Sequence, residues 1–86
     1  MMHIKLLYFA WVRETIGTDG EIVDLPAETN NITALLAFLA ARSLGHGRAL
    51  SDIGRLRFAV NQNFASPDAI LRAGDEVAIF PPVTGG

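Results

Sequence analysis

The residues best suited to chemistry stand at the end of the chain, in the run Phe80-Pro-Pro-Val-Thr-Gly-Gly86. Proline lacks a backbone N–H and has a fixed φ, so the two prolines should end any strand at Phe80 and favour an extended path. At ~3.1 Å per residue, the segment 81–86 would span roughly 19 Å. Glycine has no side chain, so the carboxylate of Gly86 could enter a narrow channel. We therefore expect Gly86 to carry the reactive carboxylate, on a tail that inserts into a partner through Pro81, Pro82, Val83, Thr84 and Gly85.

A free carboxylate such as that of Gly86 is a poor acyl donor, because its two oxygens share the charge and neither leaves readily. Adenylation by ATP would supply a leaving group, and a sulfur or amine nucleophile could then attack the carbonyl carbon. The chain has no cysteine, so any sulfur that it carries would have to sit on a C-terminal thiocarboxylate. The alternative is an inert terminus, since chain ends are commonly frayed.

No other group of residues forms a recognisable reactive site. The two histidines, His3 and His46, have no serine, cysteine or carboxylate partner at a motif spacing, and both are expected on the surface. Asp75 and Glu76 precede a strand and are interpreted as turn and solvent residues. The sequence contains neither a glycine-rich phosphate motif nor a His-Glu-x-x-His zinc motif. We therefore expect a protein that is not an enzyme on its own, with no bound cofactor and no metal site.

The composition restricts the class of protein further. Hydrophobic residues make up 50% and charged residues 19% of the 86-residue chain, which indicates one folded domain. The net charge is −2 and the basic residues are scattered, so nucleic acid is not an expected partner. The longest apolar stretch, 32–41, is too short to span a membrane, and the N-terminus does not look like a signal peptide. With the absence of cysteine, these features favour a cytoplasmic protein.

The elements that must position the tail can be predicted from hydrophobic periodicity. The helix with the clearest pattern begins after Asn31, a good N-cap, and buries Ile32, Leu35, Leu36 and Leu39. We expect it to continue to Leu44 and to stop at Gly45-His46-Gly47, followed by a connecting turn over 48–54. The segment 11–16 is expected to form a single helical turn that ends at Gly17. Strands are expected at 3–10, 20–25, 57–61 and 76–80, with one short strand in the loop 64–71.

This order of elements predicts an α+β protein, with a mixed sheet covered on one face by one main helix and the first and last strands as parallel neighbours. It is the order of a β-grasp (ubiquitin-like) domain, here 1–80, followed by an extended tail, 81–86. Because side chains alternate along a strand, Ile4, Leu6 and Tyr8 should face the helix. An apolar patch for partner docking would then lie on the open face, formed by Leu7, Phe9, Ala59 and Phe80. The alternative is that a loop covers these residues or that the register is shifted by one and they are core.

Several runs resemble one known family, the small, sulfur-carrier subunits of molybdopterin synthase. The N-terminal run Leu6-Leu-Tyr-Phe-Ala-Trp-Val-Arg-Glu14 is similar to the opening of that family, as is Ile16-Gly17 after it. The runs Ala59-Val-Asn-Gln62 and Gly74-Asp-Glu-Val-Ala78 are similar to its later signatures, in the same order. The ending Pro81-Pro-Val-Thr-Gly-Gly86 is the most specific of these runs.

The resemblance implies a β-grasp fold and a role in molybdenum cofactor biosynthesis. It implies that an E1-like adenylyltransferase uses ATP to adenylate Gly86 and that a sulfurtransferase supplies sulfur, which gives a thiocarboxylate. The tail would then insert into the large catalytic subunit of molybdopterin synthase and donate sulfur to precursor Z (cyclic pyranopterin monophosphate), forming the dithiolene of molybdopterin. The implied assembly is a heterotetramer of two small and two large subunits.

Other functions remain open from the sequence. A ubiquitin-like sulfur carrier for thiamine synthesis or tRNA thiolation would share the fold and the terminal glycines. A protein-conjugating modifier would form isopeptide bonds with lysines. An interaction module with an inert tail would keep its function after removal of Gly86.

Overall fold

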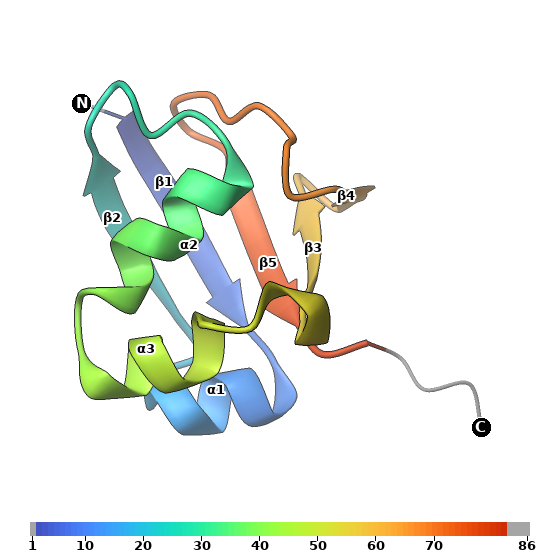
Figure 1. Ribbon diagram of the computed structural model, residues 1–86. Helices are drawn as coiled ribbons and strands as arrows, with labels where there is room; N and C mark the ends of the chain where they lie inside the picture. Colours follow the sequence, from blue (N-terminus) through green and yellow to red (C-terminus); the bar gives the residue numbers. More distant parts are fainter. Residues whose placement is uncertain (1, 83–86) are drawn as a thin grey trace.

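The computed structural model describes residues 2–82, which form a five-stranded sheet with three α-helices and one short 3-10 helix. Figure 1 shows α2 and α3 on one face of the sheet, and α1 at the end where β1 finishes. Within the described part of the chain, no helix is both long and apolar enough to cross a membrane. The elements in chain order are β1 (Met2–Tyr8), α1 (Ala10–Ile16), β2 (Gly20–Leu25), α2 (Ile32–Ala40), α3 (Leu44–Leu50), η1 (Ile53–Arg55), β3 (Arg57–Val60), β4 (Asn63–Ala65) and β5 (Glu76–Phe80).

The first and last strands lie side by side at the centre of the sheet, as the sequence predicts. The strand order is β2-β1-β5-β3-β4, and β1 and β5 run parallel while the other neighbours are antiparallel. Parallel strands place their carboxyl ends at the same edge, so β1 and β5 both finish at the lower end of the sheet in Figure 1. The chain therefore leaves the sheet at that edge after Phe80.

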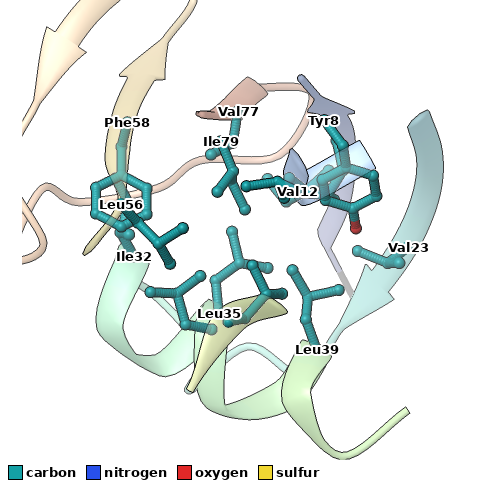
Figure 2. Packing of buried hydrophobic residues seen from close by; sticks show 14 of the residues in the cluster. Tyr8, Val12, Val23, Ile32, Leu35, Leu39, Leu56, Phe58, Val77 and Ile79 are labelled. Atoms are coloured by element: carbon teal, nitrogen blue, oxygen red, sulfur yellow. The ribbon is translucent and has the colours of Figure 1, made fainter. Parts of the chain in front are cut away.

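The core lies between the sheet and the helices. The side chains predicted to face inward from β1, Ile4, Leu6 and Tyr8, are at most 1% exposed. Their partners on β5, Val77 and Ile79, are fully buried, which confirms the predicted register. Figure 2 shows Val77 and Ile79 meeting the helix side chains in one apolar cluster, with the Tyr8 ring at its edge.

Helix α2 begins as predicted. The Asn31 side chain accepts a hydrogen bond from the Ala34 N–H at 2.8 Å, which satisfies a free donor of the first turn. The predicted buried stripe is also confirmed, because Ile32, Leu35, Leu36 and Leu39 are all buried.

The predicted end of this helix was wrong. Helix α2 stops at Ala40, and a second helix, α3, runs through the Gly-His-Gly segment that was expected to be a break and into the expected turn. Ser43 caps α3 by accepting the His46 N–H at 3.1 Å. A Cβ on Gly45 would lie 2.7 Å from the Thr15 carbonyl oxygen of α1. Gly45 therefore allows α3 to pack closely against α1, and it does not end a helix.

Segment 11–16 also forms more helix than predicted. Helix α1 spans seven residues rather than one turn, and it ends at Gly17 with a left-handed φ of 99°, as expected. It is short, and packing against α3 and the sheet supplies the stability that its length cannot.

Candidate functional site: the tail exit and the open sheet face

The tail leaves the sheet directly from its central strand. Strand β5 ends at Phe80, and Pro81 and Pro82 follow it, both half-buried. This agrees with the expectation that proline cannot continue the hydrogen-bonded ladder. The remaining tail residues predicted from the sequence, Val83, Thr84, Gly85 and Gly86, lie outside the described residues.

The end of β1 is hydrogen-bonded to the end of β5, just before the tail begins. Tyr8 and Ile79 are paired across the two central strands, and the Phe9 N–H donates to the Ile79 carbonyl oxygen at 3.2 Å. The next residue, Ala10, has a φ of 53°, a left-handed conformation that non-glycine residues seldom adopt. This bend ends β1 and starts α1, and it leaves Phe9 46% exposed.

The four residues predicted to form a docking patch are accessible on the side of the sheet away from the helices. Leu7, Ala59 and Phe80 are half-buried, while their inward-facing strand neighbours are buried. Phe9 is the most exposed of the four. Within the described residues no loop buries them, and the register is not shifted by one. Their role in docking stays a prediction.

The docking patch predicted from the sequence did not include one aromatic residue of this face, Phe64. Phe64 of β4 is 85% exposed, and its ring centroid lies 6.1 Å from that of Phe80. It is the strand partner of Ala59, so both side chains point to the same face. The sequence predicts a loop over 64–71 with one short strand, and β4 is a short strand at the start of that segment. The hairpin was not predicted, because the β3–β4 turn uses Asn61 and Gln62 at positive φ instead of the usual Asn-Gly pair. We refer to Leu7, Phe9, Ala59, Phe64 and Phe80 as the docking surface.

A shallow hollow of about 450 Å³ extends the docking surface over β1 and β2. Leu7, Phe9 and Ile22 supply apolar side chains to its wall, and Arg13 and Asp19 supply charged ones. Ile22 is 69% exposed. The open face therefore combines apolar contact area with charged groups, as protein interfaces do at their rims.

His46 lies in a different environment from the one predicted. It was expected on the surface, but it is only 8% exposed and bonds two side chains. Its Nε2 lies 2.6 Å from Glu21 Oε2, and its Nδ1 lies 2.7 Å from Ser43 Oγ. Glu21 is 25 residues away in the sequence, so no local spacing reveals this partner. His3, in contrast, is exposed as predicted and pairs with Asp24.

Glu21 collects several hydrogen-bond donors. The Tyr8 hydroxyl donates to Glu21 Oε2 at 2.7 Å, and Arg42 Nη2 donates to Glu21 Oε1 at 3.4 Å. Burial alone would raise the pKa of Glu21, but hydrogen bonds from His46 and Tyr8 and the charges of His46 and Arg42 outweigh it and lower the pKa below the ordinary 4.5. Burial, followed by the hydrogen bond and charge of Glu21, raises the pKa of Tyr8. Glu21 is therefore ionised and Tyr8 neutral at pH 7.

A mixed sheet with a parallel central pair, helices on one face and an exit at the end of the last strand defines a β-grasp, ubiquitin-like protein. The model of the ThiS family matches residues 6–86, so the chain belongs to this family. It is 49% identical over 83 residues to the molybdopterin synthase sulfur carrier subunit of Escherichia coli, and the match covers 96% of this chain and 99% of that relative.

Solved structures agree with the fold. A putative molybdopterin converting factor subunit 1 from Pyrococcus furiosus superposes with a TM-score of 0.72 at 26% identity, over 96% of this chain and all of that one. The small archaeal modifier protein SAMP1 from Haloferax volcanii superposes with a TM-score of 0.72 at 26% identity, over 98% of this chain and 99% of that one.

Proposed function

We propose that this chain is the sulfur-carrier subunit of a molybdopterin synthase and acts in molybdenum cofactor biosynthesis. The observation that carries the proposal is the 49% identity, along nearly the whole chain, to the Escherichia coli subunit of that name. The geometry supports it, because the central strand β5 leads straight into the proline-rich tail beside an exposed aromatic face. The folded body holds and delivers the tail, and the reactive group is the carboxylate of Gly86.

The chemistry starts with activation of Gly86. An E1-like adenylyltransferase joins the carboxylate to AMP at the expense of ATP and releases pyrophosphate. A sulfurtransferase then delivers sulfur at the oxidation level of sulfide (HS⁻), which attacks the carbonyl carbon, displaces AMP and loses its proton, so that the product is a thiocarboxylate. No cysteine of this chain competes as a nucleophile or as a sulfur acceptor.

The second stage takes place in the large catalytic subunit. The segment 81–86 enters the partner's active site, where the thiocarboxylate donates sulfur to precursor Z to build the molybdopterin dithiolene. The small subunit contributes the sulfur and the large subunit the catalytic residues, in a heterotetramer of two copies of each. The chain is then no enzyme by itself, and ATP is bound by the activating partner.

The docking surface would hold the large subunit against this end of the sheet. Aromatic side chains are enriched among the residues that dominate binding energy in protein interfaces. Phe9, Phe64 and Phe80 surround the point where the tail leaves β5, so docking there would deliver the tail into the partner.

Intact-mass spectrometry tests the chemistry. The full chain is incubated with ATP, an adenylyltransferase and a sulfur source, and the expected product is heavier by the difference between a sulfur and an oxygen atom. A chain lacking Gly86, treated in the same way, should show no change. An unchanged mass of the full chain, under conditions that convert the Escherichia coli relative, would refute the proposal.

A protein-conjugating modifier is the second candidate, because the structure superposes on SAMP1, which is named as a modifier. In that case the activated Gly86 would be attacked by a lysine amine in place of sulfur. Isopeptide-linked adducts in cell extracts would favour the modifier function. Co-purification with a thiazole synthase in place of a large synthase subunit would indicate a carrier for thiamine synthesis, and a thiolated tRNA product would indicate tRNA thiolation.

A further inference from the structure

We propose that a part-buried chain of hydrogen bonds, from Ser43 through His46 and Glu21 to Tyr8, positions the docking surface by fixing the end of β1 from which Phe9 projects. The role assigned to the docking surface rests on the proposed function. The positioning itself is a property of the free protein and can be measured without a partner.

The chain of hydrogen bonds connects three elements. Ser43 and His46 belong to the start of α3, Glu21 to the start of β2 and Tyr8 to the end of β1. The successive distances are 2.7, 2.6 and 2.7 Å, so all three are short hydrogen bonds, as is common for the last two, in which a carboxylate is the acceptor. Glu21 is the strand partner of Leu6, so its carboxylate points to the helix side, where α3 can reach it.

The direction of each hydrogen bond follows from the charge of Glu21. An ionised carboxylate only accepts, so His46 Nε2 must carry a proton and donate to it, as the Tyr8 hydroxyl also does. In neutral His46 the Nδ1 atom then accepts from the Ser43 hydroxyl, and in protonated His46 it donates to that oxygen. The ring nitrogens of His46 keep a partner in either state, and the Arg42 guanidinium places a positive charge next to Glu21.

Tyr8 links this chain of bonds to the docking surface. It is the last residue of β1, and Phe9 follows it directly. Ala10 has a left-handed φ, a conformation that L-residues other than glycine disfavour, so the flanking residues must hold it in place. The Phe9 carbonyl oxygen accepts from the N–H groups of Val12 and Arg13, which sets the start of α1. Anchoring the Tyr8 ring at its hydroxyl therefore restrains the residue from which Phe9 turns outward.

A role in positioning also explains why hydrogen-bonded polar side chains lie at the edge of an apolar core. Buried charged networks often add little net stability compared with apolar residues of the same volume. They do specify one arrangement of the elements they join, because an alternative packing would leave the Glu21 carboxylate without its donors. Here that arrangement is the relation of α3 and β2 to the end of β1.

The test uses the full chain with two conservative changes, Tyr8→Phe and Glu21→Gln. The control is Val23→Ala, a buried change on the same strand as Glu21 but outside the hydrogen-bonded chain. Amide hydrogen exchange of the free proteins is measured at Phe9, Val12 and Arg13, together with the free energy of unfolding and the Kd for the large synthase subunit.

Both changes should speed exchange at Phe9, Val12 and Arg13 and weaken binding, each by about tenfold, relative to Val23→Ala after correction for the measured free energies of unfolding. Equal exchange rates and equal Kd values in Tyr8→Phe and the control would overturn the proposal and leave only a structural role. If the unchanged protein does not bind the large subunit, the proposed function fails, and the exchange rates alone still decide whether Tyr8 is a positioning residue. If Tyr8→Phe does not fold, Glu21→Gln supplies the same comparison.

Discussion

The ring centroids of Phe64 and Phe80 lie 6.1 Å apart, with the ring planes tilted by 51°. This aromatic pair joins the outer hairpin of the sheet to the strand from which the tail departs. Such a pair contributes about 0.5–1.5 kcal/mol beyond the area it buries. Phe64 nevertheless remains 85% exposed, so most of its surface is available to a partner.

Phe64→Ser should weaken binding to the large subunit without unfolding the domain. The side chain is almost fully exposed in the free protein, and we expect a loss of about 2 kcal/mol in binding free energy, as for other aromatic anchors. Isothermal titration calorimetry measures this loss. An unchanged Kd would remove Phe64 from the docking surface. Ile70→Ser is a suitable control, because Ile70 is an exposed apolar residue outside the docking surface.

Phe9→Asp should also weaken large-subunit binding while the domain stays folded. A carboxylate at this position would have to be desolvated against an apolar partner surface, and the expected loss is again about 2 kcal/mol or more. Calorimetric titration and a urea unfolding curve are needed together. Unfolding of the variant in the absence of any partner would show instead that Phe9 belongs to the core.

Gly45→Ala should lower stability, although alanine favours a helix interior by about 1 kcal/mol. The added Cβ would lie 2.7 Å from a backbone oxygen of α1, so α1 and α3 must move apart at a cost of about 1–3 kcal/mol. Gly54→Ala is the control, since its Cβ would make only an ordinary contact of 3.5 Å with Asp52. Urea unfolding of the two variants gives the comparison. A more stable Gly45→Ala variant would contradict the close packing.

The stability of the domain should fall in acid through Glu21. The folded state lowers the pKa of this carboxyl below 4.5, so its stabilising effect is fully present above the unfolded pKa and is lost as the pH falls through the folded pKa. In Glu21→Gln this part of the pH dependence should disappear. Urea unfolding between pH 7 and pH 3 measures it. If the free energy of unfolding falls equally with pH in the two proteins below pH 4.5, Glu21 does not contribute to the acid sensitivity.

Gln62→Gly should raise stability by a few tenths to about 1 kcal/mol. Gln62 has a φ of 71° in the β3–β4 turn, where glycine is unstrained and other residues are disfavoured. Gln62→Val should have the opposite effect, because a β-branched residue tolerates this conformation poorly. Thermal unfolding of the pair gives the sign of each change. Equal stability of the two variants would show that the turn carries no backbone strain.

The parts of the fold that follow local rules could be predicted from the sequence. Alternation identified the inward-facing residues of β1, and the side chain of Asn31 marked the start of α2. The two prolines after Phe80 marked the end of the last strand. The parallel pairing of β1 and β5 followed from the order of strands and helix.

The parts that depend on distant contacts could not be predicted. The glycines of α3 locally predict the end of a helix. The reason for a glycine within α3 is the close approach of Gly45 to Thr15, a residue 30 positions earlier in the chain. The hydrogen-bond partner of His46 is Glu21, which lies 25 residues earlier in the chain. No local pattern indicates this contact, so the sequence predicted a surface position for a histidine that is buried. The hairpin that contains Phe64 was not predicted, because its turn lacks the glycine that usually marks a hairpin.

The parallel pairing of β1 and β5 fixes the edge of the sheet at which the tail begins. Since Tyr8 and Ile79 are in register, the end of β1 that leads into Phe9 lies beside the end of β5 that leads into Pro81 and Pro82. An enzyme that binds the open face therefore contacts the domain next to the point where the chain leaves β5, whichever chemical group the terminus carries. Under the proposed function, one docking surface would serve both the enzyme that adds the sulfur and the enzyme that receives it.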